Sequence, residues 1–266
     1  MILRNKPKLK YLLYISILAF SISIFSSCDE LGLTNNKIKT KNGWKEFIVN
    51  ETGDSVMIYY DKKKRIIAKY TFKNGYKHGP GYTYYDNGNI HFSLNYNDGF
   101  QHGVTKWFFE NGKLYRETNY IKGKREGIEK KYYDNGKLLA EIPYKNNKVQ
   151  AGLKEYLKDG SINKDLPKII IKEEDKTVFE NKIILIASLA PRAYKRKYSI
   201  VKSSNGHEYN LSLKNETKGG KAYIEYALNP GGVLMKKVKI RASAKTSLGN
   251  PIVLYKTYNL VAENKM

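Results

Sequence analysis

Two histidines in equivalent positions are the first candidates for chemistry in this sequence. His78 and His102 lie 24 residues apart, and a glycine follows each of them directly. Imidazoles on neighbouring strands could ligate a metal ion, but the next two equivalent positions hold Glu126 and Gln150, and no cysteine or acidic cluster stands at metal-binding spacing. We therefore expect both histidines to be solvent-facing loop residues, and we expect the protein to have no metal site and no cofactor.

Two glutamates, Glu117 and Glu141, are the candidates for acid–base chemistry. Paired acids hydrolyse glycosidic bonds when they converge in a cleft. Here alternation places both on the polar side of their strands, beside Lys and Arg. The sequence also has no Gly-x-Ser-x-Gly element and no phosphate-binding glycine loop before a helix. We expect no catalytic residues and a protein that is not an enzyme, with a glycan-acting enzyme as a remaining alternative.

Aromatic and basic residues that recur together are the candidates for binding. An outer aromatic row could stack on sugar rings or contact a partner protein, and lysines beside it would favour anionic glycan or lipid head groups. The alternatives are that the aromatic residues form the core that joins neighbouring units, and that the lysines are only a solvated face. The candidate binding residues are Tyr85, Trp107, Phe109, Tyr133, Lys106, Lys130 and Lys131.

These candidates share one period, because residues 59–163 consist of repeats with a 24-residue step. Self-similarity at a fixed period of this length indicates stacked supersecondary units. The unbroken glycine set is Gly88, Gly112, Gly136 and Gly160, and one aromatic set that keeps the same step is Phe72, Tyr96, Tyr120 and Tyr144.

Each unit reads as one β-hairpin. The glycines that recur every 24 residues, such as Gly88, are each the second residue of an Asn-Gly or Asp-Gly dipeptide. These residues accept positive φ and suit type I′ turns. After the turn, Phe92, Leu94 and Tyr96 alternate with polar residues, which predicts a strand with one apolar face. Because single hairpins are marginally stable, we expect the units to pair into one antiparallel β-meander over residues 41–164.

The amino-terminal residues predict export from the cytoplasm. A basic start is followed by an apolar run over residues 11–25 and then by Ser26-Ser27-Cys28. The apolar run is too short to span a membrane, and small residues follow it. We predict a signal peptide over residues 1–27 and a tether over residues 28–40. The signal peptide holds only four of the 48 Lys and Arg residues of a chain with formal net charge +23, so the mature protein stays strongly basic. This favours anionic envelope surfaces, and export argues against nucleic acid as a partner.

The segment that ends at Cys28 resembles a bacterial lipobox, with Phe25 in place of the usual leucine. The resemblance implies lipidation of Cys28 and anchoring in the cell envelope, at the outer membrane, facing the periplasm or the surface. Membrane contact would then come through the N-terminal lipid.

The repeat itself resembles the MORN-repeat variant found in many secreted bacterial proteins. The matching pattern is Tyr-x-x-Gly-x-x-x-Gly, four residues, an aromatic pair and Asn-Gly-x-Leu, and it covers roughly residues 59–163. Members of that family are often labelled as antitoxins of toxin–antitoxin systems. The resemblance therefore implies an antitoxin or immunity-type partner of a toxin as an alternative function, which fits poorly with an export signal.

Residues 165–266 lack the 24-residue step and predict a β-sandwich. Turn signals such as Asn229-Pro230-Gly231-Gly232 separate seven short β-like runs. An immunoglobulin-like sandwich is one option, although the Cys…Trp…Cys pattern of that fold is absent. The expected runs are Ile169–Lys172, Ile183–Ala187, Tyr198–Val201, Tyr209–Leu213, Ala222–Ala227, Leu234–Ile240 and Ile252–Leu260.

Together these features predict an all-β, non-catalytic envelope lipoprotein. Its repeat array would act as a scaffold that binds another envelope protein or an anionic polymer.

Overall fold

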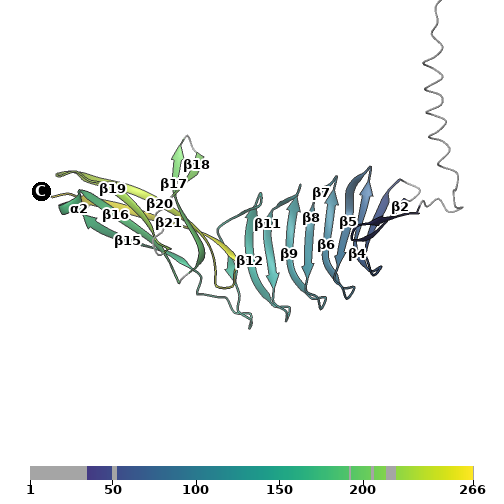
Figure 1. The fold of residues 1–266 in the computed structure, drawn as a ribbon. Helices are drawn as coiled ribbons and strands as arrows, with labels where there is room; N and C mark the ends of the chain where they lie inside the picture. Colours follow the sequence, from purple (N-terminus) through teal and green to yellow (C-terminus); the bar gives the residue numbers. More distant parts are fainter. Residues whose placement is uncertain (1–34, 50–52, 192, 205–206, 214–219, 266) are drawn as a thin grey trace, which may run out of the picture.

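A computed structural model describes residues 35–49, 53–191, 193–204, 207–213 and 220–265. The chain is elongated, with a long row of strands followed by a smaller body of strands that ends at the C-terminus (Figure 1). The predicted signal peptide and Cys28 lie outside the described residues. Within the described part of the chain, no helix has the length and apolar character needed to span a membrane.

Fourteen strands form one antiparallel sheet, which confirms the predicted meander. The main path runs β1-β2-β3-β4-β5-β6-β8-β9-β11-β12-β13, and the short strands β7, β10 and β14 pair with β6, β9 and β12. The strands are β1 (Asn35–Thr40), β2 (Gly43–Val49), β3 (Ser55–Asp61), β4 (Ile66–Lys73), β5 (Tyr76–Tyr84), β6 (Ile90–Asn97), β7 (Phe100–Gln101), β8 (Gly103–Phe108), β9 (Leu114–Ile121), β10 (Lys124–Arg125), β11 (Gly127–Tyr132), β12 (Leu138–Lys145), β13 (Lys148–Val149) and β14 (Lys154–Glu155).

The sheet begins earlier than the sequence suggested. Residues 35–40 were expected in the tether, but they form β1, which pairs with β2 from Asn35 opposite Ile48 to Thr40 opposite Gly43. This segment has a single apolar residue, Ile38, so its side chains give no alternating pattern. Its strand conformation comes from backbone pairing with β2.

The two turns of each unit differ from the expectation. At Asn87-Gly88 only the glycine has positive φ, at 86°, and Gly88 N–H donates to Tyr85 O over 2.9 Å while Tyr85 N–H donates to Asn89 O over 2.8 Å. This is a type I turn closed by a glycine bulge. The predicted type I′ turn is wrong here, because five residues separate the last paired positions, Tyr84 and Ile90, and a type I′ hairpin loop has only two.

The type I′ turns lie instead where each Gly-x-x-x-Gly stretch begins. At Asp98-Gly99 both residues have positive φ, 47° and 84°, and Asn97 and Phe100 on either side are paired. Asp98 and Gly99 therefore form a two-residue hairpin loop. Gly112, Gly136 and Gly160 also have positive φ, at 83°, 84° and 96°.

One face of the array carries its buried strand residues, and we call it the inner face. It contains an edge-to-face ladder in which the ring centroids of Tyr59 and Tyr70 lie 6.1 Å apart and those of Tyr70 and Tyr96 lie 6.0 Å apart. Gly81 is buried beneath this ladder, where a Cβ atom would stand 2.7 Å from Tyr70 Cδ1. At this part of the array the aromatic residues form the core that joins neighbouring units.

The C-terminal region forms two smaller sheets that pack together, as the predicted sandwich requires. One has the order β15-β16-β19 and the other β18-β17-β20-β21. The first, second and fifth strands thus share a sheet, which is an immunoglobulin-like arrangement with the fourth strand on the second sheet. The elements are β15 (Lys168–Lys176), the short helix α2 (Thr177–Glu180), β16 (Lys182–Ala190), β17 (Tyr194–Ser204), β18 (His207–Ser212), β19 (Ala222–Ala227), β20 (Val233–Lys245) and β21 (Pro251–Glu263).

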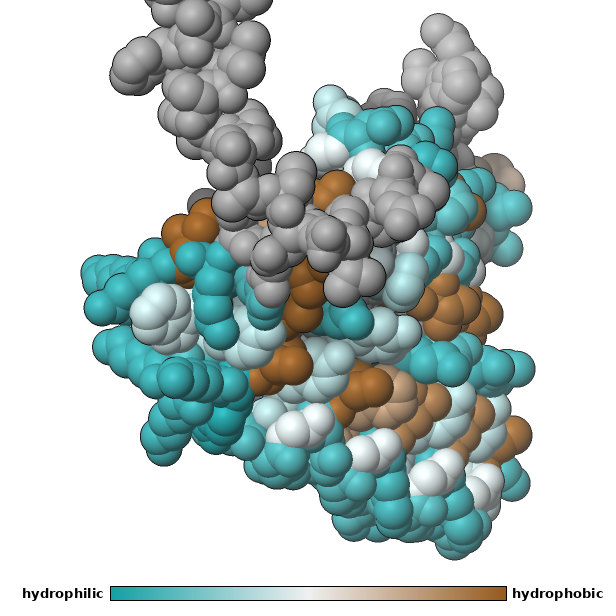
Figure 2. All heavy atoms as spheres, turned by 90° about the vertical axis from the view of Figure 1, so that its right-hand side faces the viewer, coloured by the Kyte–Doolittle hydropathy of each residue, from teal (hydrophilic) through white to brown (hydrophobic). Residues whose placement is uncertain are grey.

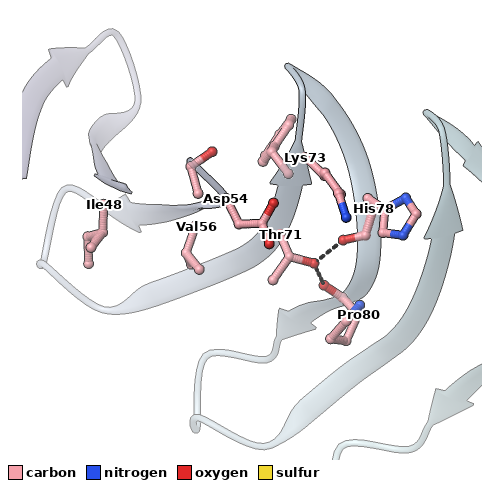
Figure 3. Close-up of a pocket in the computed structure, with 9 residues that line it drawn as sticks. Ile48, Asp54, Val56, Thr71, Lys73, His78 and Pro80 are labelled. Atoms are coloured by element: carbon pink, nitrogen blue, oxygen red, sulfur yellow. Dashed lines mark hydrogen bonds between the residues drawn. The ribbon is translucent and has the colours of Figure 1, made fainter. Parts of the chain in front are cut away.

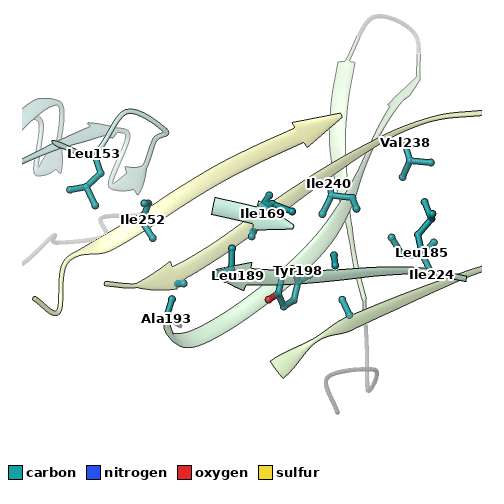
Figure 4. Close-up of a cluster of buried hydrophobic side chains, with 14 of the residues drawn as sticks. Leu153, Ile169, Leu185, Leu189, Ala193, Tyr198, Ile224, Val238, Ile240 and Ile252 are labelled. Carbon is teal, nitrogen blue, oxygen red and sulfur yellow. The ribbon is translucent and has the colours of Figure 1, made fainter. Parts of the chain in front are cut away.

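The hydrophobic core of the sandwich continues into the last unit of the array. Ile142 and Leu153 of the array belong to the same buried cluster as Ile169, Leu185 and Ile252 of the sandwich, and Figure 4 shows several of these side chains between the strands. The sandwich therefore covers the end of the array that would otherwise expose apolar residues.

A buried carboxylate lies at the same junction. Glu155 is fully buried, and its Oε1 accepts hydrogen bonds from Thr246 Oγ1 at 2.5 Å and Asn250 Nδ2 at 2.7 Å, both in the β20–β21 turn. Its Oε2 accepts a third bond from Asn163 Nδ2 at 3.1 Å. These bonds tie the last strand of the array to the sandwich.

Candidate functional site

The lysines proposed for binding are divided between the two faces of the array. Residues that pair across antiparallel strands lie on the same face, and adjacent residues lie on opposite faces. Trp107 pairs with Arg116, and Arg116 pairs with Lys131, so Trp107 and Lys131 share the inner face. Lys106 and Lys130 lie on the other, outer face. The predicted residues therefore do not form a single site.

The outer face carries a row of alternating charge across five strands. Lys106 lies opposite Glu117, Glu117 opposite Lys130, Lys130 opposite Glu141, and Glu141 opposite Lys154. We call these five residues the outer charge row. Neighbouring strands are about 4.8 Å apart, so each glutamate lies between two lysines. The two glutamates are separate members of this row and do not converge in a cleft.

Glu141 shows how the members of this row are held. Its Oε2 lies 3.6 Å from Lys154 Nζ and accepts a hydrogen bond from the Tyr156 hydroxyl at 2.9 Å. The pKa of Tyr132 is raised by burial and then by the charges of Glu117 and Glu141. Lys154 is therefore paired with Glu141, and the row as a whole offers a pattern of alternating charge instead of a basic stripe.

The inner face carries a cationic and aromatic row at the equivalent positions. The ring centroids of Phe92 and Trp107 lie 5.3 Å apart, and the Arg116 guanidinium carbon lies 4.9 Å from the Trp107 ring centroid. Trp107 is half-buried, and Tyr115 packs on it edge-to-face at 4.7 Å. The indole is therefore part of a packed cluster.

A buried acid holds the arginines of this row. Glu129 is 2% exposed, accepts a hydrogen bond from Thr118 Oγ1 at 3.0 Å, and has Oε2 3.8 Å from Arg125 Nη1 and 4.0 Å from Arg116 Nε. Arg125 also lies over the Tyr144 ring, 4.0 Å from its centroid. The buried carboxylate of Glu129 thus partly neutralises the positive charge of the inner face.

Lys131 belongs to the junction. Its Nζ donates to Asn250 Oδ1 at 2.9 Å, and burial lowers its pKa. This lysine joins the array to the sandwich, and its ammonium group is engaged there.

The outer aromatic residues also have structural partners. The Tyr85 hydroxyl donates to Phe108 O at 2.7 Å, and the Tyr133 hydroxyl donates to Tyr156 O at 2.8 Å, so each bonds the loop of the following unit. Phe109 packs against Tyr115 at 4.9 Å. The expectation that this row is exposed is wrong, because Tyr85, Phe109 and Tyr133 are half-buried between consecutive loops.

Two exposed aromatic residues were missed by the sequence analysis. Tyr76 and Phe100 follow the type I′ turns of consecutive units and are 63% and 60% exposed. A Cβ built on Gly99 would lie 3.6 Å from the Tyr76 ring, and one on Gly123 would lie 3.7 Å from the Phe100 ring. Their 24-residue spacing and their place directly after a turn glycine could have identified them from the sequence.

His78 lines a hollow at the N-terminal part of the array, together with Asp54, Thr71 and Lys73 (Figure 3). Its Nδ1 lies 3.5 Å from Asp98 Oδ1, and its side chain is 41% exposed. Groups of three or more metal-ligating side chains are absent from the residues that the structure describes. At this end of the molecule hydrophilic residues cover most of the visible surface, with apolar residues between them (Figure 2).

Comparison with known protein families identifies the repeat. Three consecutive segments, residues 77–98, 101–122 and 125–146, match the family model of the MORN repeat variant. Each segment begins just after a type I′ turn and ends at the next one. No curated protein matches this chain. The matched segments cover about a quarter of the sequence and do not extend into the C-terminal sandwich. The chain thus carries three consecutive repeat units that are similar to the MORN repeat variant.

Proposed function

We propose that this protein is a non-catalytic envelope lipoprotein whose array binds another envelope protein through its outer face. The outer charge row carries this proposal. Five charges of alternating sign at strand spacing form a pattern that a folded partner can match with the opposite alternation, and electrostatic complementarity of this kind confers specificity.

The same row favours a protein over an anionic polymer as the partner. A polyanion is attracted by excess positive charge, and Glu117 and Glu141 lie between the three lysines of the row. The positive charge of the inner face is partly compensated as well, because Glu129 lies close to Arg116 and Arg125.

The non-catalytic part of the proposal is supported by the hollows of the described residues. Three hollows of the described residues are lined by one carboxylate each, Asp54, Glu225 and Asp86. An acid pair of the glycosidase type needs two converging carboxyl groups. Attachment through lipidated Cys28 would leave the array free to project from the membrane.

The test is a pull-down from detergent-solubilised envelopes with the mature chain as bait. The decisive variant exchanges the charges of the row, as Lys106→Glu, Glu117→Lys, Lys130→Glu and Glu141→Lys together. It keeps the net charge and reverses the pattern over the first four residues of the row, and it sets two positive charges opposite each other at positions 141 and 154. We expect one retained protein to be lost with this variant.

A matched control exchanges charges away from the row, as Lys145→Glu with Glu110→Lys. We expect this control to retain the partner. If the row-exchanged variant binds the same material as the wild type, and that binding falls with salt in parallel for both, a polyanion is the partner and the protein-binding proposal is wrong.

A further inference from the structure

On one side of the sandwich, two strands each have an edge without a paired neighbouring strand. Among the described residues, β19 pairs only with β16, so its other edge is unpaired. β20 pairs with β17 only as far as Lys239 opposite Val201, so residues 233–238 of β20 pair on one side alone, with β21. β17 pairs with β18 from Ser199 opposite Ser212 to Ser204 opposite His207, and beyond Val201 this is its pairing on one side alone.

The two unpaired edges border one hollow with an apolar floor. Residues 224–226 of β19 and 236–239 of β20 line it together with the end of β17. Its floor includes Ile200, Ile224 and Val238, and the last two belong to the buried core. Lys236 Nζ reaches over the Tyr226 ring, 4.8 Å from its centroid, so it spans from β20 to β19. The hollow therefore places residues of the sandwich core beside two unpaired strand edges.

The rim of this hollow is basic. Lys202, Lys236 and Lys237 are exposed around it, and its single carboxylate, Glu225, lies 3.4 Å from Lys182 Nζ outside the hollow. Lysines protect many sheet edges from unwanted pairing. Here they surround an apolar floor beside free backbone groups, so they would also attract a strand that carries acidic side chains.

We propose that this side of the sandwich binds an extended, acidic polypeptide segment, which adds as a strand to the free edge of β19. Backbone groups of the segment would pair with β19, its acidic side chains would lie near Lys202, Lys236 and Lys237, and its alternate apolar side chains would cover Ile200 and Ile224. This combination of main-chain pairing and alternate side-chain pockets is the general mode of strand addition. The site is distinct from the outer charge row, and it does not depend on the function proposed for the array.

The test measures binding of a fluorescein-labelled decapeptide of alternating Glu and Val to the mature chain by fluorescence anisotropy. We expect saturable binding and slower amide hydrogen exchange in β19. The same peptide with N-methyl groups on every residue, which removes the backbone donors from both edges, should not bind. A peptide of alternating Lys and Val should not bind either.

Two double variants with equal charge change separate the site from the general charge of the protein. Lys236→Glu with Lys237→Glu should weaken binding by roughly tenfold or more. Lys168→Glu with Lys256→Glu, on exposed parts of β15 and β21 outside the hollow, should leave affinity within about twofold of the wild type.

Four outcomes would overturn the proposal. Absence of binding by the Glu–Val peptide, or equal binding of its N-methylated form, would show that strand addition does not occur. Equal weakening by both double variants would reduce the effect to net charge. A dimer in sedimentation that loses its β19 protection on dilution would make a second copy of this chain the occupant of the edge.

Discussion

At the scale of single residues, tyrosine hydroxyls bond successive units to one another. We expect Tyr85→Phe and Tyr133→Phe each to lower the free energy of unfolding by about 1 kcal/mol, because each loses a hydrogen bond to the carbonyl of the next loop, at 2.7 Å and 2.8 Å. Urea unfolding followed by circular dichroism measures the loss. Tyr76→Phe is the matched control, since Tyr76 is 63% exposed, and an equal loss in that variant would contradict the assignment.

A second prediction at this scale concerns pH. The Tyr60 hydroxyl donates to Glu46 Oε2 at 2.6 Å, and this bond, with burial and the carboxylate charge, raises the pKa of Tyr60 to about 12. The unfolded chain has a tyrosine pKa of about 10. The stabilisation is therefore fully present below about pH 10 and is lost as the pH rises through about 12.

This pH dependence can be measured as a difference between two proteins. The tyrosinate absorbance of the wild type minus that of Tyr60→Phe should titrate with a midpoint of about 12. Below pH 10 the wild type should be the more stable of the two, and the difference should shrink as Tyr60 ionises. A difference titration centred near the ordinary tyrosine pKa would show that the hydrogen bond to Glu46 does not persist in solution.

At the scale of the elements, the aromatic ladder of the inner face depends on the absence of a side chain at Gly81. We expect Gly81→Ala to cost about 1–3 kcal/mol, because the new Cβ would stand 2.7 Å from Tyr70 Cδ1. The φ of Gly81 is not positive, so the cost comes from packing and not from backbone strain. Thermal unfolding of the variant measures it.

A double-mutant cycle with Tyr70→Leu tests the cause. Removal of the ring should remove most of the extra cost of Gly81→Ala, so the two changes should be strongly non-additive. If the two costs are additive, contact with the Tyr70 ring is not the cause of the destabilisation by Gly81→Ala.

At the scale of the whole molecule, Glu155 couples the array to the sandwich. We expect Glu155→Ala to cost about 2–4 kcal/mol, because it leaves the buried donors of Thr246 and Asn250, and the half-buried donor of Asn163, without their acceptor. The unfolding curve should also separate into two transitions as the array and the sandwich lose this coupling.

Glu110→Ala is the control for this prediction, since Glu110 is exposed in a loop of the array. It should leave one transition at nearly the wild-type midpoint. If Glu155→Ala behaves like this control, the junction is held by the apolar contacts of Ile142 and Leu153 alone.

Much of the fold could be predicted because its causes are local. Glycines that accept positive φ recur every 24 residues, and Phe92, Leu94 and Tyr96 alternate with polar residues, so hairpins and the pairing of consecutive units follow from nearest neighbours in sequence. The seven runs predicted in the C-terminal region each fall on a strand for the same reason. The placement of the turn types failed, because loop length is set by strand pairing and not by the Asn-Gly dipeptide.

The candidate site was predicted less well, because it depends on what opposes each residue. Tyr85 and Tyr133 read as exposed from their position beside a turn, but the following loop covers them. Lys106 and Lys131 read as one basic group, but strand alternation sends them to opposite faces.

The sequence by itself therefore determined the repeat, the all-β architecture and the order of the two parts, because period and turn chemistry act over a few residues. Only the tertiary structure decided that the array ends against the sandwich. The contacts that achieve this join residues 91 to 119 positions apart, as in Glu155 with Thr246 and Lys131 with Asn250. No local pattern specifies such a pair, since its stabilisation arises only when the surrounding chain has folded and excluded water from both groups.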